Sequence, residues 1–151
     1  MRKIVVICLG VMLLGSFIYA EESAVKQYKK IIETNPNDAE AYYNIGVVYY
    51  GEKKYDSAKA QFQKAIEIYP NFSEAYYSLG AVYYAETNYD KAIEAFSKAI
   101  QIDPRNYEAI YQLGIVHNIK KDKIQALMQV NKLKAISRNE LARKLEKLIK
   151  E

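Results

Sequence analysis

The sequence predicts an all-α fold, a solenoid built from stacked pairs of antiparallel helices. The first observation behind this prediction is a repeat of fixed period, since AYYNIGVVYY at 41–50 returns as AYYSLGAVYY at 75–84 and as AIYQLGIVHN at 109–118. The second is that the three prolines of the chain keep the same spacing, at Pro36, Pro70 and Pro104. The third is the helical spacing of apolar residues inside each repeat. A fixed period of this length is typical of repeat proteins, whose units stack to share one continuous core.

Each repeat divides into two helices. In residues 39–72 the apolar face of the first helix recurs at i, i+3, i+4 and i+7. That face consists of Tyr42, Ile45, Gly46 and Tyr49. After a polar break, a second apolar face runs from Tyr55 to Ile66, and Pro70 ends the helix. Along the whole chain this pattern predicts helices at 24–34, 39–51, 55–68, 73–85, 89–102, 107–119, 123–135 and 138–150.

A glycine recurs in the middle of each first helix, at Gly46, Gly80 and Gly114. Glycine costs about 1 kcal/mol relative to alanine at such a position, so a packing reason is expected. We predict that the missing Cβ lets the second helix approach closely, opposite small residues such as Ala58 and Ala65. The sequence assigns one tyrosine of each pair to the core, with its hydroxyl toward solvent. These core tyrosines are Tyr42, Tyr49, Tyr76 and Tyr83.

This set of residues resembles the tetratricopeptide repeat. The family pattern has an aromatic residue, a Leu–Gly-like pair and a tyrosine in the first helix, then alanine, an aromatic residue and alanine in the second, and a closing proline. Residues 39–72 match through Tyr42, Ile45, Gly46, Tyr49, Ala58, Phe62, Ala65 and Pro70. Residues 73–106 match through Tyr76, Leu79, Gly80, Tyr83, Ala92, Phe96, Ala99 and Pro104. The resemblance implies a right-handed superhelix whose first helices line a concave, protein-binding surface.

The units at the two ends depart from this pattern. Residues 107–140 form a degraded third repeat, in which His117, Val130, Leu133 and Arg138 replace the tyrosine, the second aromatic residue, the second alanine and the proline. Residues 21–38 match only a second helix, which should expose Val25, Tyr28, Ile31 or Ile32. Residues 138–151 are expected to form a basic capping helix that solvates the open end of the solenoid. Ser137 and Glu140 have the spacing of a capping box for that helix.

Residues 1–20 are of a different kind. Arg2 and Lys3 precede an apolar run from Ile4 to Ala20, the pattern of a secretory signal cleaved after Ala20. The alternative is an uncleaved anchor, because a run of this length lies at the short end of what spans a bilayer. Either interpretation places the rest of the chain outside the cytoplasm, as a periplasmic or extracellular protein or one anchored to the inner membrane. Cys8 is interpreted as an ordinary apolar leader residue and not as a lipid-attachment site.

The composition argues against catalysis. One cysteine and one histidine rule out an internal disulfide and leave no set of metal ligands. His117 is therefore interpreted as a packed histidine. The sequence contains no glycine-rich phosphate loop and no nucleophile with a base, so no enzyme activity and no cofactor are expected. The net charge of +4 is mild, and although basic residues outnumber acidic ones in residues 107–151, they do not make a nucleic-acid-binding stripe.

The second tyrosine of each pair lies about 100° round the helix and is expected to face the concave groove. The positions predicted to line it are Glu40, Tyr43, Asn44, Val47, Tyr50, Glu74, Tyr77, Ser78, Ala81, Tyr84, Glu108, Tyr111, Gln112, Ile115 and Asn118. Tyr43, Tyr77 and Tyr111 should form a ladder, and the three glutamates an acidic edge. Because the groove lacks lysine and arginine, a peptide with apolar and basic side chains fits it better than a C-terminal carboxylate does.

Three other interpretations of the tyrosines and the chain ends stay open. The groove tyrosines also match the repeat consensus, so they can reflect the template of the family without a ligand. Tyrosine rows also stack on sugars, which allows a glycan. The unpaired helix at 24–34 can instead join a second copy of the chain or another exported protein, because an exposed apolar edge marks an interface. Membrane contact is expected only through residues 1–20, if they are retained, and nucleic acid is not expected as a partner.

Overall fold

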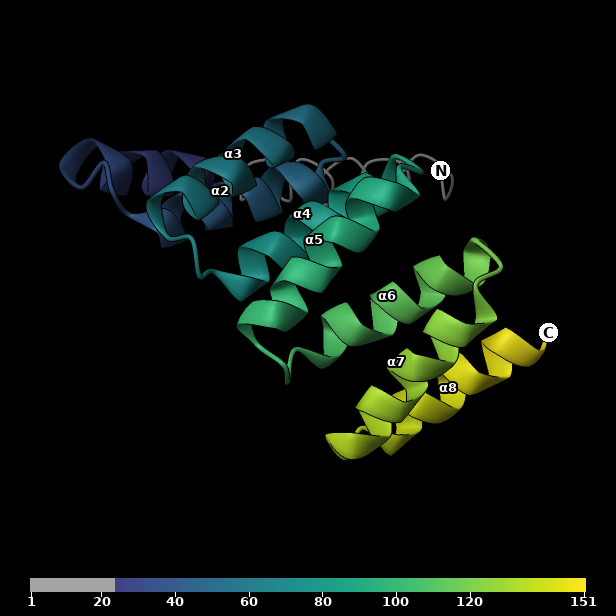
Figure 1. Cartoon of the computed structure of the whole chain (residues 1–151). Coiled ribbons are helices and arrows are strands. Elements are labelled where there is room, and N and C mark those ends of the chain that lie inside the picture. Colours follow the sequence, from purple (N-terminus) through teal and green to yellow (C-terminus); the bar gives the residue numbers. More distant parts are fainter. Residues whose placement is uncertain (1–23) are drawn as a thin grey trace, which may run out of the picture.

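The computed structural model describes residues 24–151, which form eight helices and no strand (Figure 1). The first helix covers residues 24–34. The others are α2 (Ala39–Gly51), α3 (Tyr55–Ile68), α4 (Ser73–Ala85), α5 (Tyr89–Ile102), α6 (Tyr107–Ile119), α7 (Lys123–Ala135) and α8 (Asn139–Lys150). In Figure 1 the pairs α2–α3, α4–α5 and α6–α7 follow one another as a stack, with α8 at the far end. The all-α solenoid predicted from the sequence is therefore confirmed.

The turn inside each pair has the same hydrogen-bond pattern. Lys53, Thr87 and Lys121 adopt left-handed backbone conformations, with φ of 59°, 59° and 62°. The N–H of the next residue donates to a carbonyl five positions earlier, as in Asn88 N–H to Tyr83 O at 2.8 Å. This is the Schellman arrangement that closes helix ends, here built without glycine.

The predicted capping box of the last helix is wrong. Ser137 has φ of 62° and ends α7 in the same way as the three turns above, with Arg138 N–H donating to Leu133 O at 2.8 Å. Because this conformation commits Ser137 to the end of α7, α8 begins at Asn139, one residue later than predicted. Arg138 is its N-cap residue and makes no side-chain capping bond.

The core consists of successive clusters, each made by one helix pair and the first helix of the next. Phe62 packs with Ala58, Leu79 and Val82, and Phe96 packs with Ala92, Ala99, Ala109, Leu113 and Val116. The phenylalanine of each second helix thus contacts residues of the following unit. This sharing of apolar area between neighbours is what stabilises a solenoid.

A buried polar link joins the second and third units. Ser73 Oγ donates to Ala99 O at 3.1 Å, and Asn106 Nδ2 donates to Ser73 Oγ at 2.9 Å. Asn106 Oδ1 also accepts from Ala109 N at 2.9 Å and so caps α6. The link fixes the start of α4, the end of α5 and the start of α6 relative to one another, while leaving these buried polar groups hydrogen-bonded.

The central glycines lie where the packing is tightest, as predicted, but their neighbours differ from the prediction. A Cβ on Gly46 would lie 2.6 Å from the Phe62 ring, and one on Gly80 would lie 2.7 Å from the Phe96 ring. The second-helix alanines expected opposite the glycines are therefore not the nearest atoms. The phenylalanine ring reaches the space left by the missing Cβ of the glycine, whereas the side chain of an alanine is too short to reach it.

The prediction that the first helix exposes an apolar edge is confirmed in part. At the N-terminal end Ile31 is 41% exposed, whereas Val25, Tyr28 and Ile32 are half-buried, so the predicted exposed edge is confirmed for Ile31. The predicted leader, residues 1–20, lies outside the described residues. Across residues 24–151, no helix has both the length and the apolar character needed to span a bilayer.

Candidate functional site

One cavity gathers much of the predicted groove. It has a volume of about 320 Å³ and lies on the inner faces of α2 and α4, with one contribution from α6. Eight of the predicted positions line it, namely Tyr43, Val47, Tyr50, Tyr77, Ser78, Ala81, Tyr84 and Gln112. We call this space the tyrosine cavity. Its walls hold four tyrosine rings and no charged side chain, so it suits an apolar or aromatic group that also accepts hydrogen bonds.

The floor of the tyrosine cavity is not among the positions that the sequence predicts. Phe62 of α3 and Phe96 of α5 complete the lining, although the repeat pattern assigns both only to the core. The ring centroid of Tyr43 lies 5.8 Å from that of Phe62, and that of Tyr77 lies 5.8 Å from that of Phe96. The signal available in the sequence is the mid-helix glycine: without a Cβ, it lets the phenylalanine ring of the second helix reach through to the groove face.

Burial and neighbouring groups alter the acidity of two cavity tyrosines. Burial is the main cause that raises the pKa of Tyr77, helped by the Glu108 carboxylate and opposed by a hydrogen bond with Gln112. Burial also raises the pKa of Tyr50, with a smaller contribution from Tyr55. Both phenols therefore stay neutral near pH 7, as hydroxyls that donate and accept hydrogen bonds.

The predicted acidic edge lies at the start of the groove helices. Glu40, Glu74 and Glu108 are all exposed. Glu74 is four residues before Ser78 and Glu108 four residues before Gln112, so each shares a helix face with a lining residue. The Glu108 carboxylate contributes to the raised pKa of Tyr77, after burial.

Apart from Gln112, the third unit adds no side chain to the tyrosine cavity. Tyr111 and Ile115 pack against the C-terminal cluster that contains Leu145 and Ile149 of α8, and Asn118 Nδ2 donates to Leu148 O at 3.0 Å. These three predicted groove positions are half-buried beside the cluster that α8 completes. Asn44 is half-buried outside the cavity lining. The row of Tyr43 and Tyr77 lines the cavity, but its expected third member, Tyr111, packs with the capping helix.

Leu145 explains why α8 lies so close. The third unit has Val130 where the first two have phenylalanine, so its own second helix leaves space over Gly114. A Cβ on Gly114 would lie 2.3 Å from Leu145 Cδ2, which shows that the leucine of α8 fills this space. The groove therefore ends at the third unit because a side chain from outside that unit replaces its missing aromatic ring.

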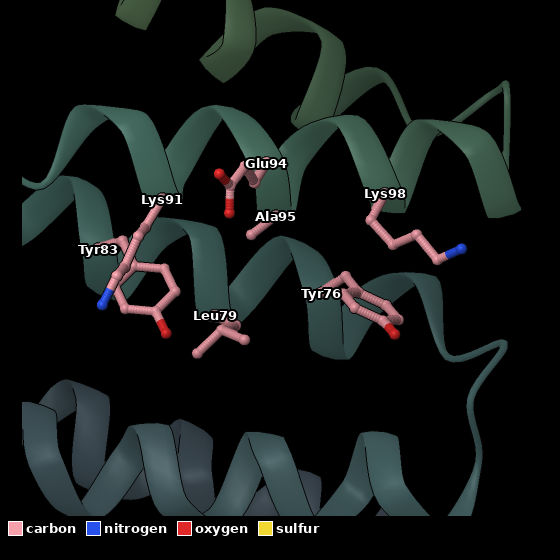
Figure 2. A pocket seen from close by; sticks show the side chains of 7 residues that line it. All are labelled: Tyr76, Leu79, Tyr83, Lys91, Glu94, Ala95 and Lys98. Atoms are coloured by element: carbon pink, nitrogen blue, oxygen red, sulfur yellow. The ribbon is translucent and has the colours of Figure 1, made fainter.

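The tyrosines assigned to the core are half-buried. Tyr76 and Tyr83 pack against the Phe96 cluster, as Tyr77 and Tyr84 also do. Tyr76, Leu79 and Tyr83 line a second cavity of about 390 Å³ with Lys91, Glu94, Ala95 and Lys98 of α5 (Figure 2). Lys91 Nζ lies 5.5 Å from the centroid of the Tyr83 ring. Core and groove tyrosines therefore support the same cluster from two sides, and differ in which surface they present.

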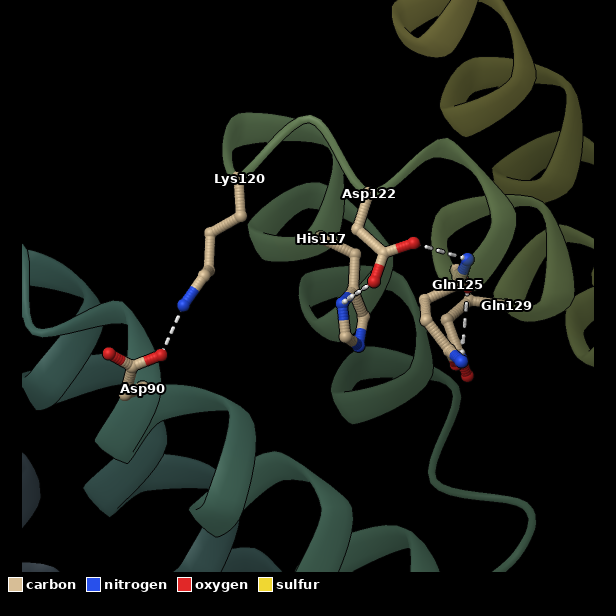
Figure 3. A network of polar contacts seen from close by, with 6 residues as sticks. All are labelled: Asp90, His117, Lys120, Asp122, Gln125 and Gln129. Carbon is tan, nitrogen blue, oxygen red and sulfur yellow. Dashed lines mark hydrogen bonds and ion pairs between the residues drawn. The ribbon is translucent and has the colours of Figure 1, made fainter.

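His117 lies near the turn between α6 and α7, as Figure 3 shows. Its Nδ1 is 3.9 Å from Asp122 Oδ2, and burial lowers its pKa more strongly than Asp122 raises it. Lys120 forms an ion pair with Asp90 of α5, which ties this turn to the second unit. Among residues 24–151 no group of three or more His, Cys, Asp or Glu side chains is placed to hold a metal ion. The surroundings of His117 are thus those of a packed histidine.

Family models match the repeats. The tetratricopeptide repeat model matches residues 39–72 and 73–106, and a second TPR repeat model matches residues 22–53. Together they cover residues 22–106, more than half of the 151-residue chain. The chain belongs to the tetratricopeptide repeat family. Members of this family are generally protein-interaction scaffolds. The family assignment gives the chain this broad functional class and does not identify a partner.

Solved structures agree with this assignment at the level of the fold. A structure described as the crystal structure of MamA is 23% identical, covers 86% of this chain and 85% of its own, and has a TM-score of 0.70. A MamA fragment from Desulfovibrio magneticus RS-1 is 28% identical over 82% of this chain and 70% of its own, with a TM-score of 0.70. The Arabidopsis OM64 TPR domain is 20% identical over 74% and 93%, with a TM-score of 0.68. A search of curated proteins found no match.

Proposed function

We propose that this tetratricopeptide repeat protein is a non-catalytic scaffold that binds a peptide segment of a partner protein in the groove formed by α2 and α4. The observation that supports this most is the tyrosine cavity, in which side chains of both complete repeats meet in one concave, uncharged space. A repeat template alone would supply the tyrosines. It would not require that they leave a space of about 320 Å³ open between them.

The chemistry of the groove indicates the type of peptide. Tyr43, Tyr77 and Tyr84 offer large, rigid rings, the kind of contact that forms binding hot spots. The exposed glutamates at the start of the helices attract lysine or arginine, and no cation in the cavity lining repels them. The proposed ligand is therefore a segment with one or two bulky apolar side chains for the cavity and a basic residue beside them. As part of the proposal, we infer from the leader-like pattern of residues 1–20 that this binding occurs outside the cytoplasm.

Two neighbouring tyrosines provide the matched test. Tyr76 and Tyr77 pack against the same Phe96 cluster, so alanine at either position should lower the melting temperature to a similar extent. Only Tyr77 lines the tyrosine cavity. Peptides selected from a random display library on the full chain are titrated against both variants, at a temperature where both are folded.

We expect Tyr77→Ala to weaken binding about 30-fold, the effect of a hot spot worth about 2 kcal/mol. Tyr76→Ala should bind as the original chain does. Equal affinity of both variants, or a library that yields no binding peptide, would exclude the groove as the site.

A second function has one specific observation in its favour. Ile31 of the helix at 24–34 is exposed, and this helix has no first helix of its own repeat before it in the described residues. Self-association through this edge is the alternative proposal. It predicts that Ile31→Glu shifts the mass measured by light scattering from oligomer to monomer. No observation in the structure favours a glycan over a peptide.

A further inference from the structure

The outward face of α7 is apolar, which is unusual for the second helix of a unit. Ile124, Leu127 and Met128 are 76%, 43% and 47% exposed and lie at i, i+3 and i+4 on one face. The opposite face packs into the core through Ala126, Gln129, Val130 and Leu133. We call the three exposed residues the α7 ridge.

Lysines flank the α7 ridge. Within α7, Lys132 lies to one side of it and Lys123 and Lys134 lie to the other, by the step of about 100° per residue of an α-helix, and Lys121 lies in the turn before the helix. Helix α7 contains no acidic residue, and within residues 24–151 no carboxylate lies within ion-pair distance of Lys121, Lys123 or Lys132. Lys134 has a partner in Glu146, at 3.6 Å. The ridge is therefore apolar at its centre and positively charged at its edges.

The equivalent helices of the first two units show that the repeat does not require this arrangement. The positions equivalent to Ile124 in the two preceding units are Asp90 and Asp56, and those equivalent to Met128 are Glu94 and Ala60. At these two positions α3 and α5 thus carry acidic or small residues, whereas the positions equivalent to Leu127 hold Ile93 and Lys59. The third unit has replaced them with large apolar side chains at a site that contributes nothing to its own core.

We propose that the α7 ridge docks on the surface of an anionic lipid bilayer. Its three apolar side chains would enter the boundary between headgroups and acyl chains, and the flanking lysines would contact lipid phosphates, as basic amphipathic helices do. This surface adds to the membrane contact predicted for residues 1–20 and is independent of peptide binding. The cavity is lined chiefly by α2 and α4, so a molecule lying on α7 keeps it accessible.

The shape of the ridge favours a bilayer over a protein helix. Ile124 protrudes from the surface, with three quarters of its area exposed. A partner helix that recognises an apolar face offers, or requires, a groove for it, and the ridge is the convex side of a helix. A bilayer needs no groove, because its interface accepts protruding apolar side chains. The charge complementarity of the flanking lysines with acidic headgroups makes that bilayer an anionic one.

The absence of tryptophan from the chain allows a site-specific test. Met128→Trp places a single fluorophore on the ridge, and Ala60→Trp places one at the equivalent exposed position of α3. Both full-length variants are mixed with vesicles of phosphatidylcholine with or without phosphatidylglycerol. Because the fluorescence reports the surroundings of the tryptophan itself, binding through residues 1–20 alone does not imitate insertion of the ridge.

The proposal predicts a blue shift for Met128→Trp with phosphatidylglycerol vesicles and no shift for Ala60→Trp. Adding Ile124→Asp, the residue type found in α3 and α5, should abolish the shift, and removing Lys123 and Lys132 should weaken partitioning roughly five-fold for each lysine. Three results would overturn the proposal: no shift, an equal shift at both positions, or a shift that grows with protein concentration without vesicles. The last would indicate a protein partner, namely a second copy.

Discussion

Gly80 illustrates how one residue can determine the packing of a whole unit. Its Cα faces the Phe96 ring so closely that a Cβ would lie 2.7 Å from Cδ1. Gly51, at the end of α2, has nothing within 4 Å of the same position. Replacing glycine by alanine is therefore expected to change the stability in opposite directions at the two positions, although both lie in helices and neither has a positive φ.

We predict that Gly80→Ala destabilises the protein by about 1–3 kcal/mol, because the Phe96 ring must move in a packed core. Gly51→Ala should instead stabilise it by up to about 1 kcal/mol, since alanine is the better helix former and meets no neighbour. Urea unfolding of both variants checks the pair. Equal effects would show that the ring contact at Gly80 does not limit the packing.

His117 gives the protein a predictable loss of stability in acid. Burial holds its pKa below the ordinary value, whereas the unfolded chain has the ordinary pKa of about 6.5. The unfolded state therefore binds the proton more tightly, and the contribution of His117 is fully present above about pH 6.5 and is lost as the pH falls through the folded-state pKa. The Asp122 carboxylate, which faces the ring, reduces this effect.

The test replaces His117 with tyrosine, the residue at the equivalent positions 49 and 83. The free energy of unfolding is measured at about pH 7.5 and about pH 5.5, on either side of the ordinary histidine pKa. The original chain should lose more stability between these values than His117→Tyr does. An identical loss in both would mean that other groups account for the acid sensitivity.

At the scale of the helix, four non-glycine residues at helix ends hold the unfavourable left-handed backbone conformation, namely Lys53, Thr87, Lys121 and Ser137. Thr87 has φ of 59°, which a β-branched residue adopts only at a cost. We expect Thr87→Gly to raise stability by about 1 kcal/mol, because glycine removes the clash of Cβ in the left-handed conformation. Thr87→Ala, which keeps the Cβ, should gain less. Thermal melts of the two variants would contradict this explanation if alanine stabilised as much as glycine.

Helix positions could be predicted closely and the place of the last helix could not. The 3.6-residue spacing of apolar residues and the recurrent prolines are local signals, and seven of the eight predicted helices have the bounds of the structure. The position of α8 depends on a contact between Leu145 and Gly114, which lie far apart in the sequence. It follows from the loss of a phenylalanine at Val130, and no local pattern in α8 shows which gap its leucine will fill.

The part of the candidate site that depends on helical geometry could be predicted from the sequence, and the part that depends on packing between helices could not. Tyr43, Tyr77 and Tyr84 could be placed on the groove face because helical geometry fixes which of two adjacent tyrosines points inward. Phe62 and Phe96 could not be placed there, because the repeat pattern assigns them only to the core. Their rings line the cavity as well because each packs against a glycine that has no Cβ. Tyr111 is not part of the cavity lining, because it packs against the C-terminal cluster that α8 completes, and the position of α8 is a tertiary feature.

At the scale of the whole molecule, the stack presents two different surfaces. The inner faces of α2 and α4 form an uncharged cavity, and exposed carboxylates lie in the first turns of the same helices. The outer face of α7, in the unit at the other end of the stack, is apolar with lysines on both sides. A protein that holds a partner segment on one surface and rests against a bilayer with another would work as a scaffold without any catalytic group.

The most direct test of the central claim fills the tyrosine cavity with a large side chain from one position of its own lining. Ala81 lies in the lining and is half-buried, whereas Ala60 is exposed on α3 outside that lining. Arginine at position 81 would occupy the cavity and repel the basic side chain expected in the ligand, and arginine at position 60 is the control. Isothermal titration of a peptide selected on the original chain should show binding to Ala60→Arg at full affinity and no measurable binding to Ala81→Arg. If the peptide bound Ala81→Arg as tightly as it bound Ala60→Arg, the groove would not be the binding site.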